Sequence, residues 1–145
     1  MKIAIIGSGF FGSTLALILS KRHKVTLYEK KNDILQGASK VNQFRFHRGY
    51  HYPRSPKTIR EIKESYNAFI KFYGKNILSN TYNYYAISKK GSKVSFKKYL
   101  KILNKNKLPY KIVNNHNYVS NKISGVIKSN EKIINYFKIK KKIKI

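Results

Sequence analysis

Three glycines near the N-terminus have a spacing that suits the binding of phosphate groups. Gly7-Ser8-Gly9-Phe10-Phe11-Gly12 matches the pattern G-x-G-x-x-G. In this pattern the first glycine permits a tight turn, the second lets the backbone approach a pyrophosphate, and the third allows close packing of a helix on a strand. Glu29 follows Gly9 by 20 residues, where a carboxylate accepts hydrogen bonds from ribose hydroxyls. These residues predict a dinucleotide site, and the acidic residue favours FAD or NAD over NADP.

The elements that must position these residues are two strands and a helix. The apolar run Ile3–Ile6 predicts a strand buried on both of its faces, and it stops at Gly7. From Phe11 to Arg22 the apolar spacing becomes helical, with Leu15, Ala16, Ile18 and Leu19 on one face. Residues 25–28 predict a second strand that ends at Glu29. Parallel strands need such a crossover helix, so the start of the chain predicts a β-α-β unit.

The remainder of the chain predicts a mixture of strands and helices. Residues 30–54 lack periodicity and predict a long loop, and a helix follows over 58–73, with Thr58 and Glu61 as its capping box and Gly74 as its stop. The elements expected after Gly74 are a strand over 82–87, a helix over 95–103 and strands over 110–113 and 123–127. The last residues, 138–145, carry neither a cap nor a turn signal.

The composition is strongly basic, with 32 Lys and Arg against 5 Asp and Glu in 145 residues. Lys, Ile, Asn and Tyr, whose codons are rich in A and T, account for half of the chain, so a low-GC genome explains the excess of lysine without a binding function. The lysines also run through every segment, whereas a nucleic-acid-binding face concentrates them. The sequence therefore predicts no specific nucleic-acid partner.

Several other classes of protein are excluded or disfavoured. With no cysteine, the chain has no disulfide, thiolate metal site or cysteine nucleophile. The apolar N-terminal stretch is interrupted by Gly and Ser and is too short for a membrane span, which also argues against a signal peptide. No metal-ligand cluster and no paired carboxylates are evident. We expect a cytoplasmic protein of 17.0 kDa with no integral membrane segment.

A longer pattern resembles a known family. The stretch from Gly7 to Glu29 is similar to the flavoprotein fingerprint G-x-G-x-x-G-x-x-x-A-x-x-L, with Ala16 and Leu19 in place. The stretches Gly37-Ala38-Ser39-Lys40-Val41-Asn42 and His47-Arg48-Gly49-Tyr50-His51 then resemble the D-amino-acid-oxidase-like family of FAD-dependent oxidoreductases. The resemblance implies an α/β fold: a Rossmann-type FAD-binding unit of the GR2 kind, followed by the start of a mixed α+β substrate domain. It also implies oxidation of an amine or hydroxy-acid C–H by hydride transfer to the flavin.

The same resemblance assigns roles to individual residues. The glycine-rich turn would hold the pyrophosphate, Glu29 and Lys30 the adenosine, Ala38 and Ser39 a phosphate or ribitol oxygen, and four residues from Asn42 to Arg48 the flavin ring. The complete set of cofactor-binding candidates is Gly7, Gly9, Phe10, Phe11, Gly12, Glu29, Lys30, Ala38, Ser39, Asn42, Arg45, His47 and Arg48. For the last four the alternative is a loop residue that makes turn hydrogen bonds or faces solvent. His51 and Tyr52 are candidates for a substrate-side acid or base, against aromatic packing on the 58–73 helix. Catalytic residues are not assigned.

The resemblance also sets expectations for the organisation of the chain. Residues 1–75 would form the FAD-binding segment and residues 76–145 part of a substrate domain. Members of the family are much longer, so we expect the N-terminal part of such an enzyme, from a split gene, a truncation or a frameshift. A companion chain is one way in which the fold would be completed. Alternatives that stay open are another flavoprotein branch, an NAD-binding Rossmann reductase, and a non-catalytic basic dinucleotide-binding or nucleic-acid-associated module.

Overall fold

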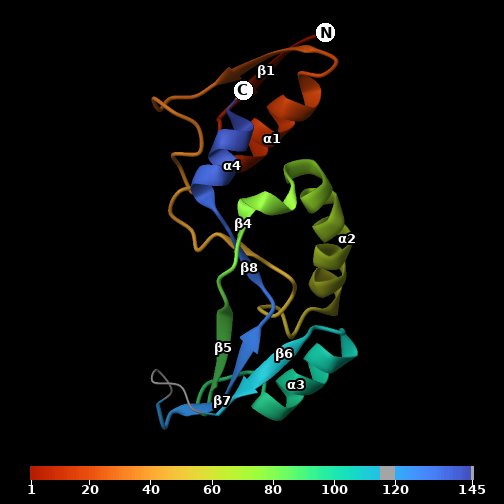
Figure 1. Ribbon diagram of the computed structural model, residues 1–145, viewed down its shortest axis with the longest axis vertical. Coiled ribbons are helices and arrows are strands. Elements are labelled where there is room, and N and C mark those ends of the chain that lie inside the picture. The colour runs from red at the N-terminus through yellow and green to blue at the C-terminus, as the bar shows by residue number, and fades with distance from the viewer. Residues whose placement is uncertain (115–119, 145) are drawn as a thin grey trace. The chain divides into compact units, whose positions relative to one another are not determined.

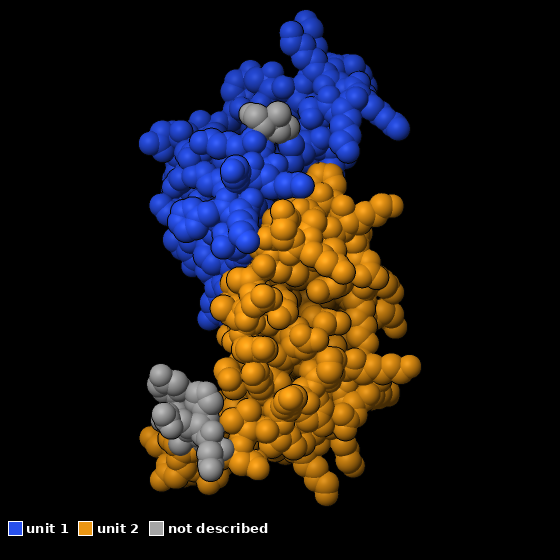
Figure 2. Space-filling model, viewed as in Figure 1, with its two compact units in different colours: residues 1–44, 134–145 blue, residues 45–133 orange. Residues whose placement is uncertain are grey.

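The computed structural model describes residues 1–114 and 120–144. The chain divides into two compact units, one made of residues 1–44 and 134–145 and the other of residues 45–133 (Figure 2). The first unit therefore combines the two ends of the chain. Figure 1 shows the elements of each unit along the chain.

The first unit contains the β-α-β arrangement that the sequence predicts. Strand β1 (Lys2–Ile6), helix α1 (Phe10–Leu19) and strand β2 (Lys24–Tyr28) follow one another, and the two strands pair in parallel from Lys2 opposite Lys24 to Ile6 opposite Tyr28. The parallel register requires the crossover that α1 provides. Because both strands end at the same edge, this register brings the turn after Ile6 beside the end of β2 at Tyr28.

The prediction that β1 is buried on both faces is wrong for this structure. Burial alternates along the strand: Ile3 and Ile5 are covered, whereas Ala4 is exposed and Ile6 is 90% exposed. β2 alternates in the same way, with Tyr28 on the open face. The apolar run reflects the composition of the strand, but the residues described here cover only one of its two faces.

A second helix in the first unit was not expected from the sequence. Helix α4 (Tyr136–Ile143) lies beside α1, and its Ile139 and Ile143, one turn apart, are buried (Figure 1). The side chain of Asn135 caps it by accepting a hydrogen bond from the backbone N–H of Lys138 at 3.0 Å. The cap is Asn135, which precedes the stretch 138–145 in which no cap was found, and Ile139 and Ile143 supply an i, i+4 apolar pair.

The second unit is built from short strands and two helices. Its elements are β3 (Arg45–Phe46), α2 (Pro56–Tyr73), the short 3₁₀ helix η1 (Lys75–Ile77), β4 (Leu78–Ser79), β5 (Asn83–Ser88), α3 (Phe96–Lys105), β6 (Tyr110–Val113), β7 (Ile123–Ser129) and β8 (Lys132–Ile134, whose last residue belongs to the first unit). The strands form a three-stranded sheet in the order β3-β8-β4 and an antiparallel sheet in the order β5-β7-β6. The helices and longer strands match the predicted ones, and β3 interrupts the predicted loop.

The start of α2 differs from the predicted capping box. Ser55 is the cap, because its hydroxyl accepts a hydrogen bond from the N–H of Thr58, and Pro56 occupies the first helical position. Proline suits this position because its missing N–H would have no partner inside the helix. The helix thus begins two residues before Thr58, and it ends as predicted at Gly74, whose φ is +84°.

The core of the second unit joins α2, α3 and the antiparallel sheet. Its fully buried side chains are Tyr50, Ile59, Tyr99, Leu103 and Ile127. The hydroxyls of the two tyrosines are satisfied, since that of Tyr50 donates to the carbonyl of Pro109 at 2.6 Å and that of Tyr99 to the carbonyl of Tyr50 at 3.0 Å. Burial raises the pKa of both phenols, so they stay neutral donors.

The two compact units do not coincide with the predicted division at residue 75. Helix α2 and the segment from Arg45 onward belong to the second unit, and residues 134–145 belong to the first. The functional division into 1–75 and 76–145 stays a prediction.

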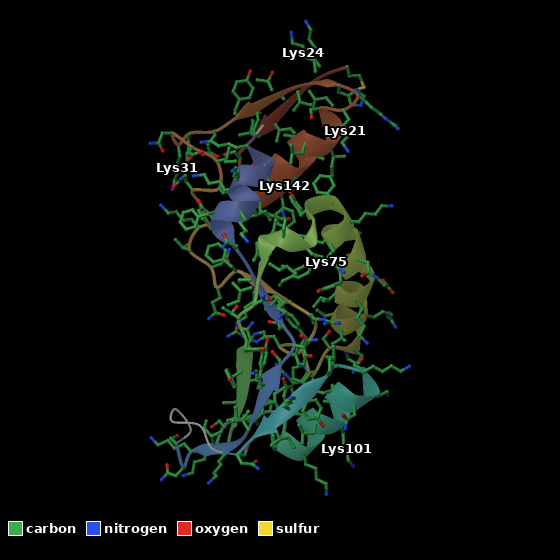
Figure 3. All side chains as sticks on the ribbon, in the orientation of Figure 1. Lys21, Lys24, Lys31, Lys75, Lys101 and Lys142 are labelled. Carbon is green, nitrogen blue, oxygen red and sulfur yellow. The ribbon has the colours of Figure 1, made fainter. Side chains whose placement is uncertain are left out.

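The surface lysines come from many elements. Those labelled in Figure 3 follow α1, begin β2, lie in the loop after β2, and belong to η1, α3 and α4. Among the helices described, none is long and apolar enough to cross a membrane.

Candidate functional site

The turn between β1 and α1 has the geometry that its glycines predict. Gly7 has a φ of +94°, which side chains disfavour, and its N–H donates to the carbonyl of Tyr28 at 2.7 Å. Gly12 lies directly over this turn: a Cβ atom there would lie 1.9 Å from the carbonyl oxygen of Gly7. The structure thus uses Gly7 for the conformation of the turn and Gly12 for the close approach of α1.

The N-terminus of α1 leaves backbone donors available. Gly9 is the cap residue and has no side chain to accept from the helix. Of the first three helical N–H groups, which have no acceptor inside a helix, that of Phe10 donates to the Ser39 hydroxyl oxygen at 3.1 Å. The N–H groups of Phe11 and Gly12 are therefore the donors available to an anion, and the helix dipole favours negative charge at this end.

Glu29 lies at the end of β2 against the same turn. Its Oε2 accepts hydrogen bonds from both the N–H and the hydroxyl of Ser8, each at 2.7 Å, and its Oε1 accepts from the N–H of Lys31 at 3.0 Å. A carboxylate has about four acceptor positions, so room remains for one more donor. The side chain is exposed, and a ribose hydroxyl could reach it. Lys30 is exposed beside it.

These donors lower the pKa of the Glu29 carboxyl from 4.5 to about 2, the N–H and hydroxyl of Ser8 contributing most. A carboxyl whose pKa is depressed by folding stabilises the fold above its unfolded pKa, and this stabilisation disappears as the pH falls through the folded pKa. We therefore expect the unfolding free energy of the wild type to exceed that of Glu29→Gln at neutral pH. The difference should shrink as the pH falls from about 4.5 to about 2.

Urea unfolding of both chains over this pH range measures the difference directly. Glu61→Gln is the matched control, because it removes the same charge from an exposed position on α2, where Glu61 forms an i, i+4 pair with Lys57. A difference for Glu29→Gln that stays constant between these pH values would contradict the proposed role of the Ser8 donors.

The loop after β2 packs its backbone against the turn. Leu35 is fully buried, with a φ of +60°, and its N–H donates to the carbonyl of Ser8 at 3.0 Å. Ser39 contacts Phe10 as described above, whereas Ala38 is exposed. The Asn42 amide donates to the carbonyl of Ala38 at 3.1 Å, and its oxygen accepts from the N–H of Phe44 at 2.7 Å. Asn42 thus makes turn hydrogen bonds, and a role beside the flavin stays a prediction.

The first unit accordingly brings together most of the predicted residues. Glu29 contacts Ser8 in the glycine-rich turn, and Ser39 contacts the N–H of Phe10. The adjoining loop carries Lys30, Ala38 and Asn42. The sequence analysis missed Ser8, Ser13 and Leu35. Ser13 is buried, and its hydroxyl donates to the carbonyl of Ser8 at 2.9 Å. Ser8 could have been predicted, because it stands between two glycines of the turn, where its hydroxyl can face the end of the neighbouring strand.

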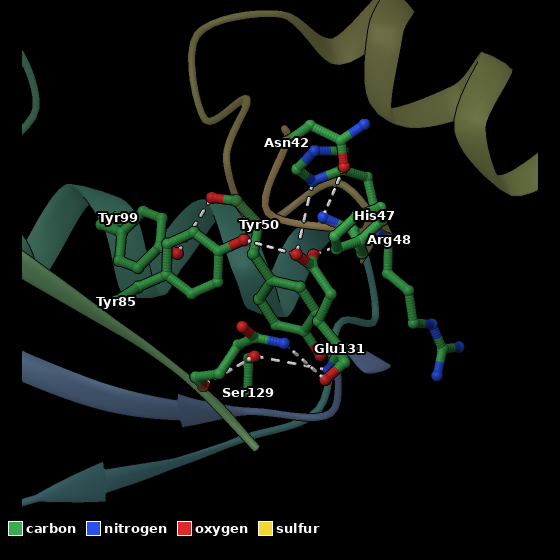
Figure 4. A network of polar contacts seen from close by, with 10 residues as sticks. Asn42, His47, Arg48, Tyr50, Tyr85, Tyr99, Ser129 and Glu131 are labelled. Atoms are coloured by element: carbon green, nitrogen blue, oxygen red, sulfur yellow. Dashed lines mark hydrogen bonds and ion pairs between the residues drawn. The ribbon is translucent and has the colours of Figure 1, made fainter. Parts of the chain in front are cut away.

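Arg45, His47 and Arg48 belong to the second unit. His47 and Arg48 lie beside one buried carboxylate, that of Glu131 (Figure 4). His47 Nδ1 lies 3.3 Å from Oε1 of Glu131, and the N–H of Arg48 donates to Oε2 at 3.1 Å. The guanidinium of Arg45 lies 5.3 Å from the centre of the Tyr85 ring, whose hydroxyl also donates to Glu131. The side chain of Arg48 extends away from the carboxylate, over the ring of Tyr66.

The sequence analysis missed Glu131. It is one of only five acidic residues and lies in the short connection between β7 and β8, and its rarity is the signal that could have identified it. The adjacent candidates His51 and Tyr52 differ in burial, since His51 is exposed and Tyr52 is half-buried against the core. Both rings lie within 6.0 Å of the His47 ring, measured between ring centres. This position does not decide between an acid–base role and packing.

Known proteins resemble this chain both in sequence and in fold. Residues 2–105 match the family model described as FAD dependent oxidoreductase. A protein named FAD-dependent monooxygenase kojA, from Aspergillus flavus, is 38% identical over 87 residues, covering 59% of this chain and 20% of that protein. The FAD-dependent monooxygenase FPY4 from Fusarium mangiferae is 31% identical over 102 residues, covering 70% of this chain and 28% of that protein.

Two solved structures have a similar fold. Glycine oxidase from Geobacillus kaustophilus superimposes with a TM-score of 0.75 at 13% identity, covering 97% of this chain and 42% of that one. Glycine oxidase from Bacillus cereus ATCC 14579 superimposes with a TM-score of 0.67 at 20% identity, covering 98% of this chain and 42% of that one. The chain thus spans less than half the length of each of these relatives.

Proposed function

Because this chain belongs to the FAD dependent oxidoreductase family, whose model its residues 2–105 match, we propose that its first unit binds FAD through the adenosine diphosphate part. The observation that carries the proposal is the turn after β1, where Gly12 fits over Gly7 and the N-terminus of α1 offers the N–H groups of Phe11 and Gly12. The expected family and fold class are confirmed by the comparisons.

The residues of the first unit suit an FAD molecule in shape and charge. A Cβ atom on Gly9 would meet only the Ser39 hydroxyl, at 3.8 Å, so the surface above Gly9 is open to a phosphate group. The N–H groups of Phe11 and Gly12 would donate to pyrophosphate oxygens. Glu29 would accept from a ribose hydroxyl, and Ser8 would hold the carboxylate in place for it.

Three of the residues predicted to lie beside the flavin are close together in the chain. In this proposal Arg45, His47 and Arg48 supply positive charge or N–H groups toward the flavin ring, where such groups stabilise the reduced anion. Bound FAD would supply the two-electron acceptor for oxidation of an amine or a hydroxy acid. The named relatives include monooxygenases and glycine oxidases, which differ in reaction and substrate. Oxidation of an amine or a hydroxy acid is therefore a proposal for this chain.

We further propose that additional polypeptide covers the open face of the β1–β2 pair in the working enzyme. Parallel strands are found almost only in sheets with both faces covered. Here Ile6 is 90% exposed, and on α1 the side chains of Phe11, Leu15 and Ile18 form an exposed apolar stripe. A companion chain is one source of this cover, and a longer form of the same chain is another.

Titration of the purified chain with FAD, ADP and NAD tests the proposed cofactor. We expect FAD to bind with a shift of its visible absorption, and ADP to compete with it, because both carry the part that the first unit recognises. Preferential binding of NAD would instead support the NAD-binding alternative. If none of the three binds to a chain that circular dichroism shows to be folded, the proposal is wrong.

A further inference from the structure

Glu131 is a charged side chain that the fold buries completely. It lies between β7 and β8 and is 0% exposed, although the chain has only five acidic residues and 32 basic ones (Figure 4). Moving a carboxylate out of water costs several kcal/mol unless it is paired and hydrogen-bonded. A buried carboxylate therefore requires hydrogen-bonding or charged partners within the fold.

Two hydrogen-bond donors and one histidine ring nitrogen converge on the Glu131 carboxylate. The Tyr85 hydroxyl donates to Oε1 at 2.8 Å, the N–H of Arg48 donates to Oε2 at 3.1 Å, and Nδ1 of His47 lies 3.3 Å from Oε1. Burial by itself would raise the pKa of the Glu131 carboxyl, but these partners together hold it below its ordinary value. The backbone of Glu131 is fixed as well, since the Asn83 amide donates to its carbonyl at 3.0 Å.

The contact with His47 has a consequence that the other two lack. An ionised carboxylate can only accept hydrogen bonds, so the ring nitrogen facing it must carry the proton. Nδ1 of His47 is inaccessible to solvent, whereas the side chain as a whole is 36% exposed. Nδ1 is therefore covered, and Nε2 is the ring nitrogen left for a ligand.

We propose that Glu131 is a positioning residue for His47, which keeps a proton on Nδ1 and presents Nε2 to a bound ligand. The Tyr85 hydroxyl and the Arg48 N–H hold the carboxylate, and the carboxylate holds the imidazole. The identity of the ligand rests on the proposed function: Nε2 would contact the anionic edge of the flavin ring or the substrate beside it. A neutral ring accepts a proton at Nε2, and a charged ring donates one.

The first part of the test needs no cofactor. In the chain labelled with ¹⁵N in its histidine rings, nitrogen chemical shifts report which ring nitrogen is protonated, and the His47→Gln variant identifies the signals of His47. We expect a proton on Nδ1 at neutral pH in the wild type and a loss of this preference in Glu131→Gln. Tyr85→Phe, which keeps the carboxylate beside His47, should retain it. An unprotonated Nδ1 in the wild type would overturn the proposal, even if Glu131→Gln failed to fold.

The second part compares the affinities for FAD and for ADP. Because ADP lacks the flavin ring, we expect Glu131→Gln to bind ADP as the wild type does and FAD about tenfold more weakly, the effect of losing one charge-assisted contact. His47→Gln should lower the FAD affinity by the same factor, and the double variant should lose no more than either single one. Glu61→Gln, an exposed carboxylate replaced in the same way, should change neither affinity.

The outcomes separate the two proposals. If the wild type binds neither FAD nor ADP, the proposed function fails, while the histidine measurement still decides whether Glu131 positions His47. If FAD binds equally well to Glu131→Gln and to the wild type, the ring is not presented to the cofactor and this inference is wrong. A purely structural role for Glu131 predicts lower stability with an unchanged ratio of FAD to ADP affinity.

Discussion

Replacing Gly9 with valine is expected to weaken the binding of FAD about 100-fold or more, equivalent to about 2.7 kcal/mol, while the chain stays folded. Gly9 has a φ of −62° and a ψ of 179°, an extended conformation that valine adopts readily. In the protein alone a Cβ atom at this position would meet only the Ser39 hydroxyl at 3.8 Å. The side chain would occupy the space through which a phosphate group approaches the backbone, so the loss falls on the ligand.

Fluorescence titration with FAD measures this loss, and urea unfolding serves as its control. We expect the unfolding free energy of Gly9→Val to lie within about 1 kcal/mol of the wild type, because glycine has only a modest advantage at a helix cap. Gly9→Ala should bind with intermediate affinity, since its side chain is shorter. Wild-type affinity in the valine variant would exclude the turn as the pyrophosphate site.

Replacing Gly12 with alanine is expected to destabilise the first unit by about 3 kcal/mol and to abolish FAD binding. The new Cβ atom would lie 1.9 Å from the carbonyl oxygen of Gly7 and 3.1 Å from its carbonyl carbon. Both are backbone atoms, so α1 must move away from the turn. A loss of stability would distinguish this clash from the usual effect of the substitution, because at an unobstructed helical position alanine is about 1 kcal/mol more favourable than glycine.

Circular dichroism during urea unfolding measures the stability of this variant. Gly37→Ala is the matched control: nothing lies within 4 Å of a Cβ atom there, so its unfolding free energy should change by no more than about 0.5 kcal/mol. A Gly12→Ala chain that is as stable as the wild type would contradict the close approach of α1 to Gly7. Together the variants at Gly9 and Gly12 separate damage to the ligand site from damage to the fold.

The sequence by itself determined the local elements and the turn between them. The spacing of Gly7, Gly9 and Gly12 predicts the β-α-β unit, and the parallel pairing of β1 with β2 confirms it. Local signals also predicted α2, α3 and the strands β5, β6 and β7 of the second unit, including the stop at Gly74. These features could be predicted because a positive φ, a close helix approach and an apolar period depend on residues near one another in the chain.

Other local predictions failed where a neighbouring element decided the outcome. The apolar run of β1 is compatible with burial on both faces, but what covers a face is chosen by distant residues, and Ile6 is exposed. Likewise, α4 has only eight residues, and a helix this short is marginal in isolation. Tertiary packing of Ile139 and Ile143, with the ion pairs from Lys140 and Lys144 to Asp33, stabilises α4.

Only the tertiary structure decided which polar groups meet. His47 and Glu131 lie on segments far apart in sequence, and nothing in the spacing of either one indicates the other. Leu35 reaches the carbonyl of Ser8 in the same way, through a loop without periodicity. The physical reason is that a conformational preference acts over a few residues, whereas the burial of a carboxylate is a property of the assembled core. The sequence therefore predicted the glycine-rich turn, and the fold placed the buried carboxylate of Glu131 beside His47.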